Sequence, residues 1–228
     1  MRKLLVIALA GPLAFVLAVG AVFGAPMSAA AGGPPSAVAL AEIPADLLAV
    51  YADAATTCSG LPWQVLAAIG FTESRHAGGR ADPATGDVDP PIVGPAIDGR
   101  PGFAAIRDPM SPDGWAHALG PMQFLSPTWV RWAMLAPGRP PGATPSVHNA
   151  WDSIYAAAGK VCADAGGSGD LAAALFAYNN SAAYVAGVLA KALDYGWGQS
   201  GDVTAAIPGA RVIATAGATV SGSGEAVA

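Results

Sequence analysis

The chain carries little charge. Only 12% of its 228 residues are charged, the net charge is −5, and no run of basic residues follows Lys3. Nucleic-acid binding needs clustered Lys and Arg side chains that neutralise phosphates, so this composition predicts no nucleic-acid partner. A ligand that is recognised through hydrogen bonds and stacking, such as a carbohydrate, suits the composition better.

Cysteine is also scarce, because the chain has only two, Cys58 and Cys162. An even pair in an exported chain is most simply a disulfide, and a Cys58–Cys162 bridge is our prediction. The alternative is a thiol nucleophile or a metal-binding pair. Either would need a histidine partner close in sequence, and neither cysteine has one.

The acidic residues lack the spacing of a known metal site. Asp82, Asp87 and Asp89 lie in a loop with Gly and Pro, which leaves a calcium site open as an alternative. Their spacing does not match an EF-hand loop, and carboxylates in such loops are usually solvated. We therefore predict no metal and no cofactor.

A long apolar run stands near the N-terminus. Arg2 and Lys3 precede the apolar residues 4–25, and small residues at 28–32 offer a cleavage site. This pattern predicts export, either into the cell wall or to the outer face of the cytoplasmic membrane. The run is long enough to span a bilayer, so a cleaved signal peptide and a retained membrane anchor both stay open.

Helical patterning dominates the rest of the chain. Between 77 and 118 this periodicity disappears, and so long a segment without regular structure is typical of a lid or a cleft wall. Helices are expected at 44–58, 62–74, 126–135, 149–162, 170–178 and 181–195. We divide the chain into a signal or anchor at 1–31, a linker at 32–43, a mainly α domain at 44–197 and a disordered, low-complexity tail at 198–228.

Glu73 stands out in the helix expected at 62–74. At about 100° per residue it falls on the same stripe as Leu66, Ile69 and Gly70. Ionising a carboxyl group on an apolar stripe is costly, so its pKa should rise. A carboxylic acid that keeps its proton near neutral pH suits general acid catalysis. The alternative is a Glu at a helix end that simply reaches water.

Two further segments place polar side chains among apolar ones. They are Gly-Pro-Met-Gln-Phe at 120–124 and Tyr-Asn-Asn-Ser-Ala-Ala-Tyr at 178–184. Gln123 would be an unpaired amide unless something bonds it, and a sugar hydroxyl or N-acetyl group is one candidate. Tyr178 and Asn179 stand at the seam between two expected helices, where side chains can project into a cleft.

Together with Glu73-Ser74, these motifs in this order resemble the lytic transglycosylases of bacterial cell walls. The resemblance covers about 44–195 and is greatest to the branch of membrane-bound lytic transglycosylase B. It implies a lysozyme-like helical domain, similar to goose-type lysozyme, with long irregular loops around a substrate cleft. It also implies cleavage of the MurNAc–GlcNAc bond of peptidoglycan glycan strands without water, which leaves 1,6-anhydromuramic ends.

By this resemblance, Glu73 would be the single catalytic acid and base, and Tyr178 would hydrogen-bond to it and orient it. Two other functions stay open: hydrolysis of the same bond by water, as in goose-type lysozyme, and non-catalytic binding of peptidoglycan. Nothing in the sequence indicates an oligomeric state. Substrate contacts are implied for Ser74, Met122, Gln123, Phe124, Asn179 and Tyr184.

Overall fold

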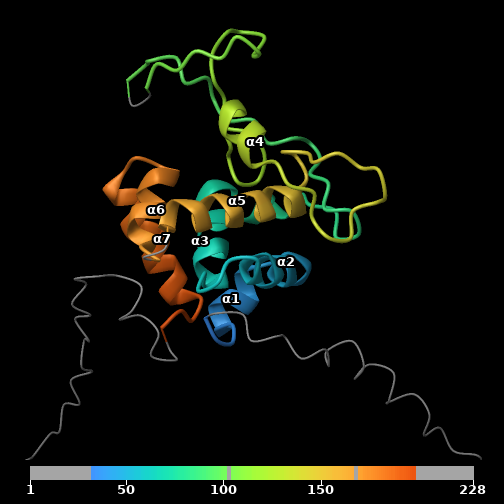
Figure 1. The fold of residues 1–228 in the computed structure, drawn as a ribbon, viewed down its shortest axis with the longest axis vertical. Helices are drawn as coiled ribbons and strands as arrows, with labels where there is room; N and C mark the ends of the chain where they lie inside the picture. The colour runs from blue at the N-terminus through green and yellow to red at the C-terminus, as the bar shows by residue number, and fades with distance from the viewer. Residues whose placement is uncertain (1–31, 102–103, 167–168, 199–228) are drawn as a thin grey trace, which may run out of the picture.

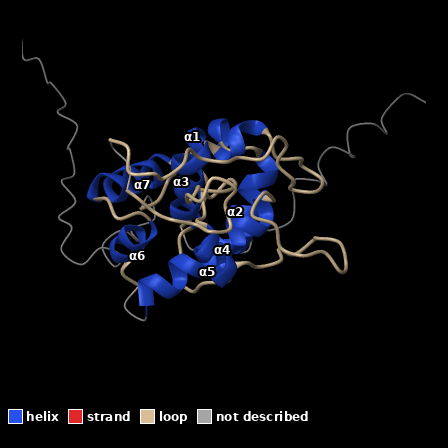
Figure 2. Ribbon diagram, turned by 90° about the horizontal axis from the view of Figure 1, so that it is seen from above, coloured by secondary structure: helices blue, strands red, loops and turns tan. Residues whose placement is uncertain are grey.

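The computed structural model describes residues 32–101, 104–166 and 169–198 of a mainly helical protein (Figure 1 and Figure 2). Within those residues there are seven α-helices, one 3₁₀-helix and no β-strand, which confirms the mainly α class. The expected signal or anchor at 1–31 and nearly all of the expected tail lie outside this part of the chain. Over the same residues, no helix combines the length and the apolar character that crossing a membrane requires.

Most helices begin where the sequence predicts. Asn149, Asp170 and Ser181 cap their helices, each by accepting hydrogen bonds from backbone N–H groups of the first turn. Helix α4 begins at Ser126, the first residue of the helix expected at 126–135, and Leu125 is its N-cap residue. The bounds are α1 Ala37–Glu42, α2 Ala45–Thr56, α3 Trp63–Ser74, the 3₁₀-helix η1 His76–Gly79, α4 Ser126–Trp132, α5 Ala150–Ala165, α6 Leu171–Tyr178 and α7 Ala182–Asp194.

Helix α3 forms the centre of the fold. Every residue from Trp63 to Gly70 is buried, and the helix packs against α2, α5 and α7. Such close packing requires a small residue at Gly70, where an added Cβ would lie 1.9 Å from the hydroxyl of Tyr51 on α2. Because the body of α3 is surrounded, only its C-terminal turn, which carries Glu73, remains to meet a ligand.

Residues 32–43 belong to the folded domain, so the predicted linker is wrong. They include α1, whose Ala39 is completely buried. Trp63 Nε1 donates a 3.0 Å hydrogen bond to the Gly33 carbonyl, and Ser36 Oγ donates a 2.6 Å bond to the Asp194 carbonyl. A short segment rich in Ala, Pro and Gly resembles a linker in composition, and only its tertiary contacts reveal that it packs against the core.

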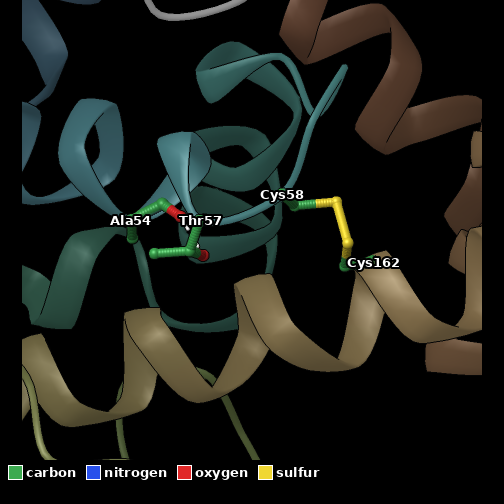
Figure 3. The surroundings of a disulfide bond; sticks show 4 residues. All are labelled: Ala54, Thr57, Cys58 and Cys162. Carbon is green, nitrogen blue, oxygen red and sulfur yellow. Dashed lines mark hydrogen bonds between the residues drawn. A yellow bond between two sulfur atoms is a disulfide. The ribbon is translucent and has the colours of Figure 1, made fainter.

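The predicted disulfide is confirmed. Cys58 lies just beyond α2 and is bonded to Cys162 of α5, with their Cα atoms 5.7 Å apart (Figure 3). Thr57 Oγ1 donates a 2.6 Å hydrogen bond to the Ala54 carbonyl, which closes the end of α2 beside the bridge. The bond joins residues 104 positions apart and excludes a role for either cysteine as a nucleophile or metal ligand.

The described residues of 80–118 form no helix or strand but are ordered by backbone pairing. Ile106 N donates to Ile97 O, Ile97 N donates to Ala116 O, and Ala116 N donates to Ile106 O, each at 2.9 Å. We call the described residues of 93–119 the ribbon. In Figure 1 the ribbon is the green segment that extends beyond α4 from one end of the helical body.

Candidate active site

A cleft of about 520 Å³ lies between the ribbon and the helical body. Glu73 of α3, Ile97 and Ile106 of the ribbon, Gln123, and Asn179 at the end of α6 all line it. Residues of the irregular segment therefore form part of the lining of this cleft. Residues from three distant parts of the sequence meet here, because α3 and α6 both pack against α7 and because Ser74 and Tyr178 hydrogen-bond to the backbone at 121 and 122.

Glu73 is partly buried at the cleft end of α3, and its stripe neighbours Leu66 and Ile69 are fully buried. Burial raises the pKa of Glu73 from 4.5 to about 7, and a hydrogen bond from Tyr184 acts in the opposite direction. The alternative of a fully solvated Glu is therefore wrong. Glu73 can hold a proton near neutral pH and can also release it, as a group that acts first as acid and then as base must do.

The hydrogen bond to Glu73 comes from Tyr184, not from Tyr178 as the resemblance implied. Tyr184 Oη donates to Glu73 Oε1 at 2.6 Å, whereas Tyr178 Oη donates to the Met122 carbonyl at 2.9 Å. The two tyrosine rings are stacked, with 4° between their planes and 6.4 Å between their centroids. Burial, together with the charge of Glu73, raises the pKa of both hydroxyls, so both remain protonated donors.

Gln123 lies in a tight hairpin. Leu119 and Phe124 exchange backbone hydrogen bonds of 2.8 and 2.9 Å across it. The φ of Gln123 is 51°, a left-handed conformation that is uncommon outside glycine, and its Nε2 donates a 2.9 Å bond to the Gly120 carbonyl. At Gly120 a Cβ would lie 1.7 Å from the Val147 carbonyl oxygen, so only glycine fits. Strain of this kind is common at functional sites.

Three of the predicted substrate contacts support the site rather than face a ligand. Ser74 Oγ donates a 2.7 Å hydrogen bond to the Pro121 carbonyl, while the neighbouring Met122 carbonyl accepts from Tyr178. The side chain of Met122 is fully buried, and Phe124 borders the cleft but is only 2% exposed. Ser74 and Tyr178 thus hold two successive carbonyl groups and fix the hairpin that carries Gln123.

Lys160 also lines the cleft, and no sequence pattern pointed to it. It is only 9% exposed, and its Nζ donates a 2.6 Å hydrogen bond to Asp164 Oδ2. A Lys–Asp pair one helical turn apart normally marks a solvated face, so the sequence is misleading here. The nearest feature of the sequence is that the small apolar residues Ala156 and Ala157 share a helix face with Lys160, and the structure buries both of them completely.

The loop carboxylates considered for calcium bond to the protein itself. Asp87 Oδ1 accepts a 2.8 Å hydrogen bond from Asn149 Nδ2, and Asp82 Oδ1 accepts from the backbone N–H groups of Ala84 and Thr85. In the part of the chain that the structure describes, no three His, Cys, Asp or Glu side chains gather in a way that could hold a metal ion.

No family model, curated protein or solved structure matches the chain. Function is therefore inferred from the geometry of the cleft together with the motifs that line it. A carboxylic acid whose pKa lies near neutrality, and which accepts a hydrogen bond from a partly buried tyrosine hydroxyl, can protonate a polar ligand and later remove a proton from it.

Proposed function

We propose that this protein is a lytic transglycosylase that cleaves peptidoglycan glycan strands between MurNAc and GlcNAc, and that its helical domain is lysozyme-like. The observation that carries the proposal is Glu73, which faces the cleft with a pKa of about 7. The sequence motifs that resemble this family also supply residues to the same cleft. Glu73, Gln123 and Asn179 line it, although about fifty residues separate each from the next.

In the proposed reaction, the carboxylic acid of Glu73 gives its proton to the glycosidic oxygen as the bond from that oxygen to the muramic anomeric carbon breaks. The Glu73 carboxylate then takes the proton of the C6 hydroxyl of the same sugar, and the C6 oxygen bonds to the anomeric carbon. Glu73 ends protonated, as it began, and the product is a 1,6-anhydro ring. Tyr184 bonds to Oε1 throughout, which leaves Oε2 to transfer the proton.

The number of acids in the cleft suits this reaction. Glycoside hydrolases usually position two carboxyl groups, about 5 to 9 Å apart, one of which acts as nucleophile or activates water. Among the described residues that line this cleft, Glu73 is the only carboxylic acid. An internal hydroxyl nucleophile needs no second carboxylate, because its attachment to the reacting sugar already provides a high effective concentration.

Mass spectrometry of digested peptidoglycan tests the proposal. Wild-type protein should release fragments that are lighter by one water than hydrolytic products, and Glu73→Gln should release almost none. Asp89→Asn is a matched control, because Asp89 is an exposed acid that does not line the cleft. Products with reducing ends would favour the lysozyme-like hydrolase. If Glu73→Gln cleaves as fast as the wild type, both enzymatic functions are contradicted. A wild type that binds peptidoglycan but never cleaves it would support non-catalytic binding as the function.

A further inference from the structure

The ammonium group of Lys160 is held at the cleft wall by contacts from two helices. Its Nζ donates to Asp164 Oδ2 at 2.6 Å and to the Ala177 carbonyl of α6 at 3.2 Å. It also lies 5.0 Å from the centroid of the Tyr178 ring. A Lys side chain that is only 11% exposed is rare unless it is paired, and pairing here fixes it beside the ligand space.

The contacts of Lys160 leave it one hydrogen bond to give. An ammonium group has three N–H donors, and Asp164 and Ala177 accept two of them. Asp164 also balances the positive charge, so the third N–H suits a neutral carbonyl oxygen. The position of Lys160 therefore indicates ligand binding.

The groups around Lys160 have complementary chemistry. The side chains of Asn179 and Asn180 line the same cleft, both residues are exposed, and each carries one amide oxygen that can accept a hydrogen bond. Across the cleft, Ile97, Ala104 and Ile106 of the ribbon present apolar surface. One wall thus offers a donor and acceptors, and the other offers a place for a small apolar group.

We infer that Lys160, Asn179 and Asn180 form a subsite for the acetamido group of an N-acetylated sugar. The carbonyl oxygen accepts from Lys160 Nζ, the amide N–H donates to an Asn side-chain oxygen, and the methyl group packs against Ile97 or Ile106. A hydroxyl group at the same sugar carbon has neither a carbonyl oxygen for Lys160 nor a methyl group to pack against Ile97 or Ile106. The inference rests on the proposed function only in assuming that a glycan occupies the cleft.

Calorimetry on the full chain carrying Glu73→Gln, which removes cleavage, tests the subsite. The probes are β-1,4-linked oligosaccharides of N-acetylglucosamine and of glucose, equal in length and both uncharged. Lys160→Met is combined with Asp164→Leu, because replacing both partners of this shielded ion pair avoids leaving one charge unpaired. Lys191→Met is the matched control, because Lys191 is a similarly shielded, ion-paired ammonium group that does not line the cleft.

The chain that carries Glu73→Gln alone, which we call the parent chain, should bind the N-acetylated probe at least about tenfold more tightly than the glucose probe. A difference of this size is expected from one hydrogen bond with a charged donor. K160M/D164L should remove most of that preference, while K191M should keep it. An unchanged preference in K160M/D164L, or no preference in the parent chain, overturns the subsite. If K160M/D164L fails to fold, Asn180→Ala replaces it, with a smaller but measurable loss of preference expected and its absence equally decisive.

The subsite and the lyase function can fail separately. If the Glu73→Gln chain prefers the N-acetylated probe but the wild type does not cleave peptidoglycan, the subsite is supported and the lyase function is contradicted. If the wild type forms anhydro products but the binding preference is unchanged when Lys160 is replaced, the lyase function is supported and the subsite is contradicted.

Discussion

Tyr184 Oη donates a 2.6 Å hydrogen bond to Glu73 Oε1 across 111 residues of sequence. The bond stabilises the carboxylate, whereas burial stabilises the acid, and the balance leaves the pKa of Glu73 at about 7. Tyr184 comes from the first turn of α7, whose contact with α3 brings the two side chains together. The acidity of Glu73 is thus set by packing between two helices.

Tyr184→Phe should raise the pKa of Glu73 above about 7, because it removes the hydrogen bond that lowers it. The alkaline limb of the kcat/KM profile, where the acid loses its proton, should therefore move to higher pH. Tyr178→Phe is the control, since its hydroxyl bonds to the Met122 carbonyl and not to Glu73. Equal movement of the limb in both variants would contradict the assignment of Tyr184.

Glu73→Gln should lower the rate of peptidoglycan cleavage by roughly a thousandfold, the scale of general acid–base catalysis.

Glu73→Gln should also stabilise the protein in a pH-dependent way. Folding raises the pKa of Glu73, so the wild type is relatively most stable below about 4.5 and loses stability as pH rises through about 7. Urea denaturation should show no gain for the variant near pH 4 and a gain of roughly 2–3 kcal/mol near pH 8. An equal gain at both would contradict a raised pKa.

Gly120→Ala should disrupt the hairpin that carries Gln123. Gly120 has φ 71°, and a Cβ there would meet the Val147 carbonyl oxygen at 1.7 Å. Gly142→Ala is a matched control, because Gly142 has φ 81° but open space around it. We expect thermal denaturation to show a loss of about 1 kcal/mol for Gly142→Ala and at least about 3 kcal/mol for Gly120→Ala. Similar losses would mean that the contact with Val147 is unimportant.

Replacing both cysteines with Ala should lower the free energy of unfolding by roughly 4–5 kcal/mol in the chain-entropy model, since the bridge closes a loop across 104 residues. Chemical denaturation with and without reductant measures this. Reductant should destabilise the wild type by a similar amount and leave the double variant unaffected. A wild type that is insensitive to reduction under denaturing conditions would contradict the prediction.

His76 should weaken the fold in acid. Its ring nitrogens lie 3.1 Å from Tyr51 Oη and 2.9 Å from Tyr195 Oη, and burial lowers its pKa from 6.5 to about 4, although Glu42 opposes the shift. A lowered His pKa means that its contribution to stability is complete above 6.5 and is lost as pH falls towards about 4. His76→Gln should flatten the stability profile over that interval.

The His76 comparison is best made in chains that also carry Glu73→Gln, because Glu73 titrates over an overlapping pH range with the opposite sign. Urea denaturation at several pH values measures the slope. Identical slopes with His76 and with Gln at this position would show that the histidine is not kept neutral by the fold.

Local patterns explain what was predicted correctly. The helix that carries Glu73 follows from apolar periodicity and from Pro62 just before it, and both signals depend on neighbours within a few residues. The caps at Asn149, Asp170 and Ser181 are equally local. Pairing of Cys58 with Cys162 needed no geometry, because the chain has no other cysteine.

By itself, the sequence determined the mainly α class, the disulfide and the choice of Glu73 as the candidate acid. Helix periodicity, helix capping and the number of cysteines can be recognised without knowing which distant segments pack together. Only the tertiary structure decided that Tyr184 and not Tyr178 bonds to Glu73, that Met122 is buried, and that Lys160 reaches the cleft. Tyr178 and Tyr184 stand six residues apart on two different helices, α6 and α7, and helix packing alone selects which of them reaches Glu73. The burial that raises the pKa of Glu73 likewise comes from elements distant in sequence, so it arises only when the chain folds.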